Sequence, residues 1–271
     1  MTPHFTHFAS ASAWQALTPS DQWQHLLAQH AGQWNGLLIR FDGTGQVLDV
    51  LDSVRQFTPS SDRQTITHSL DFRSRHTRSV RQQQWNLTPG DPLISHPVDP
   101  NALLLFNPTG ADAMVGRDRT KPEGFYFEPY LRIGNRRVSV VVMYRGAEAG
   151  AEPNFFSLFR EVRADSGEPW WSSDTTCRIQ PCTQLSLSLA QPKAMHIQLE
   201  TLHYRHIAPD PQTIAGDFLQ IQFPDGIELV LSRDRFHLPY CASLNWATQQ
   251  STRRCLLLYS QPSQQPELLA F

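Results

Sequence analysis

Between residues 34 and 163, apolar side chains recur at every second position in short segments separated by turn-forming residues. This alternation predicts β-strands, whose successive side chains point to opposite faces. No helical pattern lies between the segments, so a parallel βαβ arrangement is not expected. A long antiparallel series must bury its edge strands, and closure into a barrel is the usual solution. The predicted strands are 34–41, 47–57, 64–72, 79–87, 102–106, 124–132, 136–145 and 155–163.

One helix is predicted ahead of these strands. Thr18 is a suitable N-cap, Pro19 follows at the first helical position, and an acidic residue stands three positions after the cap. Apolar residues then recur at helical spacing until Gly32, which can end the helix. The pattern predicts a helix over residues 19–31 that packs on an apolar surface.

A second strand series follows an interruption at residues 164–169, which we interpret as a domain boundary. Its predicted strands are 184–189, 194–206, 217–223, 227–231, 236–246, 252–259 and 267–271. The two halves share an ordered set of features, in which an aromatic-proline-tyrosine segment precedes an Arg-Arg pair and then a tyrosine that ends an apolar run. We interpret this as a duplication. The expected fold is therefore all-β, with two antiparallel barrels in tandem over residues 1–164 and 165–271, the second being smaller.

Composition excludes several classes of protein. A net charge of −2 argues against a general nucleic-acid or anionic-membrane binder, which would usually be basic. No apolar stretch approaches the roughly 20 residues that span a bilayer, and the N-terminus lacks the pattern of a secretory signal. The four cysteines are too few for a disulfide scaffold and lack zinc-knuckle spacing, so we expect buried thiols and no metal site. These features predict a soluble cytoplasmic protein.

The first strand begins with Gly32-Gln33-Trp34-Asn35-Gly36. This segment resembles the G-x-W entry of lipocalins, in which the tryptophan closes one end of the barrel, often under an arginine. Arg160 or Arg163 is a candidate for that arginine, through a cation–π contact. Together with the helix, the strand series and the two Arg-Arg hairpins, it resembles a cyanobacterial family of unknown function with two tandem lipocalin-like (calycin) domains. The resemblance implies a fold and leaves the cofactor unknown.

Polar residues on apolar strand faces are the candidate ligand-binding residues. His68 shares a strand face with Leu70 and two other apolar residues, so it either meets a buried partner or lines a cavity. On a later strand, a carboxylate stands between two phenols, and a buried carboxylate there would need a cation such as Arg137. This face could equally be an outward stripe or a buried structural pair. The candidate ligand-binding set is Trp34, His68, Tyr126, Glu128, Tyr130 and Arg137.

No standard catalytic motif is present, and His203 and His206 would lie on opposite faces of a strand, which does not suit one metal ion. Four arginines form the densest basic patch, which is either a solvated loop or a docking point for an acidic protein partner: Arg73, Arg75, Arg78 and Arg81.

Barrels of about eight strands hold either side chains or one small ligand. The leading hypothesis is therefore a binder of a small apolar or amphipathic molecule, with tetrapyrroles and other pigments as candidates. One alternative is a barrel enzyme, such as a chromophore lyase or an isomerase, that uses His68 or Glu128 for proton transfer. The other is a non-catalytic assembly module with filled barrels.

Overall fold

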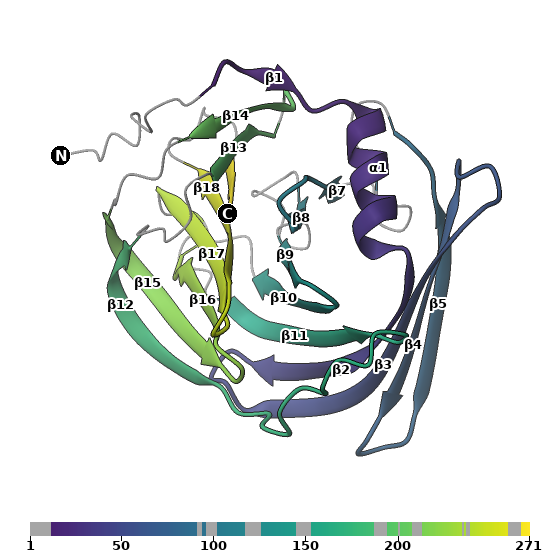
Figure 1. The fold of residues 1–271 in the computed structure, drawn as a ribbon. Coiled ribbons are helices and arrows are strands. Elements are labelled where there is room, and N and C mark those ends of the chain that lie inside the picture. The colour runs from purple at the N-terminus through teal and green to yellow at the C-terminus, as the bar shows by residue number, and fades with distance from the viewer. Residues whose placement is uncertain are drawn as a thin grey trace.

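The computed structural model describes residues 12–90, 94–95, 102–116, 126–144, 153–186, 194–199, 201–207, 213–234, 236, 239–259 and 267–271. These residues form one α-helix and two antiparallel β-sheets (Figure 1). The all-β class with a short N-terminal helix, predicted from the alternating pattern, is confirmed. No helix within the described ranges has the length and apolar character needed to cross a membrane.

Helix α1 (Pro19–His30) begins at a capping box, as its sequence predicts. The Thr18 hydroxyl accepts a hydrogen bond from the Asp21 amide at 3.1 Å, and the Asp21 carboxylate accepts one from the Thr18 amide at 3.2 Å. The buried face of the helix packs against inward-facing side chains of the first sheet in one cluster, with Trp23, Leu26 and Leu27 as its own contribution. The helix thereby closes one end of the barrel that this sheet forms.

The strands of the first sheet lie side by side in the order β5-β4-β3-β2-β11-β10-β9-β8-β7-β6. The β2–β11 pair joins the start of the series to its end, so the sheet curls into a half-barrel, called the first barrel below, with β5 and β6 as its edge strands. The strands β6 and β8 were not predicted. The bounds are β2 (Gly32–Asp42), β3 (Val47–Pro59), β4 (Ile66–Ser74), β5 (Val80–Leu87), β6 (Ile94–Ser95), β7 (Ala102–Leu105), β8 (Ala111–Gly116), β9 (Tyr126–Ile133), β10 (Arg136–Tyr144) and β11 (Pro153–Arg163).

The second sheet has the order β1-β14-β13-β19-β18-β17-β16-β15-β12. The single strand predicted over 194–206 is wrong, because the chain turns after β13 and returns as β14, with Leu202 in the left-handed region at φ 50°. Predicted strand residues 124–125, 145, 187–189, 200, 237 and 238 lie outside the described residues. The bounds are β1 (Gln15–Ala16), β12 (Arg178–Ser186), β13 (Ala194–Gln198), β14 (His203–Ile207), β15 (Thr213–Phe223), β16 (Ile227–Ser232), β17 (Tyr240–Ala247), β18 (Thr252–Tyr259) and β19 (Glu267–Ala270).

The two sheets share one buried cluster. Even-numbered residues of β10 and β11, such as Val140 and Leu158, point out of the first barrel and belong to the same cluster as Leu229 and Leu257 of the second sheet. A separate cluster covers the opposite face of the second sheet and draws on strands from both ends of its order, such as β12 and β14, so that face is the inside of its curve. The domain boundary at residue 164 and the duplication stay predictions.

Candidate functional site

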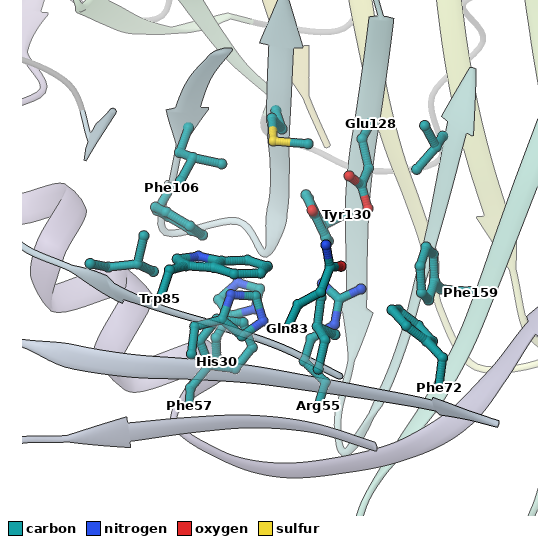
Figure 2. A pocket seen from close by; sticks show the side chains of 16 residues that line it. His30, Arg55, Phe57, Phe72, Gln83, Trp85, Phe106, Glu128, Tyr130 and Phe159 are labelled. Carbon is teal, nitrogen blue, oxygen red and sulfur yellow. The ribbon is translucent and has the colours of Figure 1, made fainter. Parts of the chain in front are cut away.

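The first barrel contains a partly open cavity of about 190 Å³ (Figure 2). Helix α1 supplies one lining residue, and strands β3, β4, β5, β7, β8, β9, β10 and β11 supply nearly all the others. Most of the lining is apolar or aromatic. The lining residues are His30, Arg55, Phe57, His68, Leu70, Phe72, Gln83, Trp85, Leu87, Leu104, Phe106, Met114, Glu128, Tyr130, Val141 and Phe159.

His68 lies on the inner face of β4, together with Leu70 and Phe72, as the alternation predicts. Its imidazole stacks on the ring of Phe57, with centroids 4.0 Å apart and planes at 15°, and meets Trp85 edge-on at 4.5 Å. His68 is therefore an aromatic member of the cavity wall.

A group of three polar side chains, those of Glu128, Tyr130 and Arg55, lies between the apolar walls of the cavity. Glu128 and Tyr130 face inward from β9, and in Figure 2 Tyr130 lies between Glu128 and Arg55, with Phe72 and Phe159 to one side. Ser139 donates a hydrogen bond to Glu128 Oε1 at 3.1 Å. Burial raises the pKa of the Glu128 carboxyl, although the nearby Arg55 guanidinium and hydrogen bonds from Tyr130 and Ser139 oppose this. Burial also raises the pKa of the Tyr130 phenol well above its usual range.

Behind this group runs a buried chain of ion pairs that the sequence did not reveal. Arg55 Nε lies 3.1 Å from Glu161 Oε1, and Arg137 contacts Glu161 Oε2 through Nε at 2.8 Å and NH2 at 2.7 Å. Gly36 makes room for this acid, because it faces Glu161 across the β2–β11 pair and a Cβ there would lie 2.7 Å from Glu161 Cγ. Glu161 thus holds both guanidinium groups.

The expected pairing of Arg137 with Glu128 is wrong. In the β10–β11 register Arg137 stands directly opposite Glu161, whereas in the β9–β10 register it stands opposite Arg132. Glu128 comes four residues before Arg132 in β9, where it accepts a hydrogen bond from Ser139. The positive charge that lowers the pKa of Glu128 is that of Arg55, on β3, a strand distant from β9 in the sequence.

Trp34 is fully buried at the end of the barrel closed by α1, and it lies outside the cavity lining. Its indole Nε1 donates to the His30 carbonyl at 2.9 Å. Arg137 lies 4.5 Å from its ring centroid, and Arg163, one of the two predicted partners, lies 5.9 Å away. Arg160 points the other way, where it contacts Asp225 Oδ2 at 2.5 Å.

The remaining predicted residues either lie away from the cavity or have side chains outside the part of the chain that the structure describes. The backbone of Tyr126 in β9 stands opposite that of Met143 in β10, and the side chain of Tyr126 lies outside the described residues. In the basic patch, Arg75 forms an exposed ion pair with Asp52 at 2.7 Å, and Arg73, Arg75 and Arg78 line a surface groove. Binding of an acidic partner there stays a prediction.

The cysteines and acids of the described residues form no group of three that could hold a metal ion. Of the thiols expected to be buried, Cys241 and Cys255 are buried, whereas Cys177 and Cys182 are half-buried.

His30 connects the ion-pair chain to Asp112. Arg137 NH1 lies 2.7 Å from His30 Nδ1, and because a guanidinium can only donate, Nδ1 must be the acceptor. The ring proton therefore sits on Nε2, which lies 2.8 Å from Asp112 Oδ2. Burial and then the positive charge of Arg137 hold the pKa of His30 well below its usual range, and burial raises the pKa of Asp112 to about 8.

We expect the His30 ring to stay neutral as the pH falls from about 7.5 to about 6. The unfolded chain takes up this proton first, so His30 alone would lower stability below about pH 6.5, by at most about 1.4 kcal/mol per pH unit. Asp112 has the opposite sign, because its raised pKa favours the folded state as the pH falls below about 8. The two effects overlap, so the measurement is the NMR titration of the His30 ring, assigned with His30→Gln. The same ring in urea-unfolded protein should titrate near about pH 6.5, and a similar midpoint in folded protein would contradict the expectation.

Comparison with known proteins gives one family match. Residues 19–166 match the model described as "Domain of unknown function (DUF3598), N-terminal". The chain is similar to the crystal structure of a protein of unknown function from the DUF3598 family of Nostoc punctiforme, with a TM-score of 0.64, 16% identity and coverage of 92% of this chain and 97% of that chain. The S-type phycobiliprotein lyase of Guillardia theta matches with a TM-score of 0.29, 12% identity and coverage of 54% and 94%, a likeness too slight to bear on fold or function. The search of curated proteins gave no match.

Proposed function

This chain belongs to the DUF3598 family, for which no function is known, and we propose that it binds a small, mainly apolar ligand inside its first barrel. The observation that carries the proposal is the cavity of about 190 Å³, lined mostly by apolar and aromatic side chains with a few polar groups. Pockets of this composition are typical of small-molecule sites, where the polar groups fix the orientation of the ligand.

The size of the cavity favours a compact ligand. An engineered apolar cavity of roughly 150 Å³ binds benzene, so this slightly larger one suits one or two fused rings. A tetrapyrrole, with four linked rings, would require the barrel to widen. The assembly-module alternative assumed barrels filled with side chains, and the cavity in the first barrel favours binding over that alternative.

A substitution that fills the cavity should abolish binding. Val141 faces the cavity from β10, so Val141→Trp would place an indole in the space of the ligand. Val54→Trp is the matched control, because Val54 is exposed on the outer face of β3. With naphthalene as the probe, calorimetry should show binding to the wild type and to Val54→Trp, and at least about a tenfold loss of affinity in Val141→Trp. Equal affinities of the two variants, or no binding to the wild type, would overturn the proposal.

A further inference from the structure

The charges around the cavity indicate an uncharged ligand. In the buried network of the described residues, the carboxyl groups of Glu128 and Glu161 match the guanidinium groups of Arg55 and Arg137 in number. Asp112 adds little negative charge at about pH 7, because burial raises its pKa to about 8. An anionic ligand would add a negative charge that this balanced set does not offset, and a cationic ligand would lie beside Arg55. A buried charge without a partner is strongly unfavourable. An uncharged ligand avoids both conflicts.

The polar side chains of the cavity offer an acceptor and a donor in the same small region. Ser139 holds Glu128 Oε1 from one side, which fixes the plane of the carboxyl group at the cavity wall. Arg55, anchored through Nε to Glu161, can only donate hydrogen bonds. Tyr130 lies between Glu128 and Arg55, with the Arg55 guanidinium carbon 5.9 Å from its ring centroid, so the three side chains form one polar strip (Figure 2).

The walls beside this strip are aromatic. Phe72 and Phe159 lie to one side of it, and Phe57, Trp85 and Phe106 lie to the other, as Figure 2 shows. Planar rings pack well against such walls. The site therefore combines a flat apolar space with paired hydrogen-bonding groups at its middle.

We infer that the ligand is an uncharged cyclic amide, whose ring N–H donates to Glu128 while its neighbouring carbonyl accepts from Arg55. This inference rests on the proposed function and names its ligand class. A lactam presents its N–H and carbonyl on adjacent atoms in one plane, which matches an acceptor and a donor joined by Tyr130. The carboxyl group of Glu128 can take part in either protonation state, because one of its oxygens still accepts when the other is protonated.

Four bicyclic probes of similar size test the inference on the intact protein. 2-Quinolinone has the lactam N–H and carbonyl, coumarin keeps the carbonyl but has a ring oxygen in place of N–H, naphthalene has neither group, and 2-naphthoate carries a negative charge. Calorimetry at about pH 7 should give 2-quinolinone the highest affinity, at least about tenfold above coumarin, because the lost hydrogen bond leaves a buried acceptor without its donor. 2-Naphthoate should bind most weakly.

The variant Glu128→Leu should remove the preference for the lactam over coumarin. Naphthalene is the internal control for folding, since its affinity for this variant should stay within about threefold of the wild type. Glu168→Leu removes an exposed carboxylate and should leave all affinities unchanged. If Glu128→Leu does not fold, the ranking of the four probes on the wild type decides the question.

The outcomes separate this inference from the proposed function. If 2-quinolinone and coumarin bind with equal affinity, or if 2-naphthoate binds most tightly, the cyclic-amide inference is overturned while the cavity remains a binding site. If none of the probes binds to the wild type, the proposed function itself fails.

Discussion

Replacing Glu161 by leucine will lower the free energy of unfolding by about 3–5 kcal/mol. Glu161 is fully buried and contacts both Arg55 and Arg137, so its removal leaves two guanidinium groups in the barrel without their shared carboxylate. A buried charge that loses its partner keeps the full penalty of its removal from water. Urea denaturation followed by tryptophan fluorescence measures the loss.

The control is Asp52→Leu, which also removes a carboxylate from an arginine. The Asp52–Arg75 pair is about half exposed on both sides (52% and 51%), so its loss should cost less than about 1 kcal/mol. Similar losses in the two variants would show that Glu161 does not hold the network together. Replacing Arg137 by methionine in the Glu161→Leu background should recover part of the stability, because one of the two unpaired guanidinium groups is then removed while Arg55 stays beside the Glu128 carboxyl.

The second large effect is expected for Trp34→Ala, which should cost about 3–5 kcal/mol of the free energy of unfolding. Trp34 is fully buried where α1 closes the barrel, and it is contacted by the guanidinium of Arg137 and bonded to the His30 carbonyl. Its removal leaves a void and withdraws the ring on which the arginine packs.

Trp170→Ala provides the comparison, because Trp170 is 49% exposed and its loss should change the stability by less than about 1 kcal/mol. Thermal denaturation of both variants checks this difference. Equal changes in melting temperature would contradict the role given to Trp34.

The elements that the sequence predicts well are those with strong local signals. Helix α1 follows from its capping box and proline, and the strands β3, β10 and β18 follow from clear alternation or a long apolar run. β8 was missed because its sequence, Ala-Asp-Ala-Met-Val-Gly, contains few residues that favour strands. The turn between β13 and β14 was missed because it contains no glycine or proline, and Leu202 adopts the left-handed conformation instead.

The candidate site was only partly predictable for a different reason. Strand alternation placed His68, Glu128 and Tyr130 on faces that the structure directs into the cavity. The partners of these residues depend on which strands become neighbours, which local patterns do not encode. Glu161 was not singled out because it stands between Arg160 and Val162 in a strand where charged and apolar residues mix, and only the register of β10 on β11 brings it to Arg137. The same lack of register information led to the wrong partner for Arg137.

The measurement that tests the central claim most directly is NMR of protein labelled with ¹³C at the methionine methyl groups, titrated with naphthalene. The chain contains four methionines. Met114 lines the cavity, and Met195 is fully buried in the core shared by the two sheets. A ligand inside the first barrel should shift the Met114 methyl signal and give nuclear Overhauser contacts to it, while Met195 stays unchanged. Contacts to Met195 alone, or a Met114 signal that does not respond at saturating naphthalene, would contradict a binding site in this barrel.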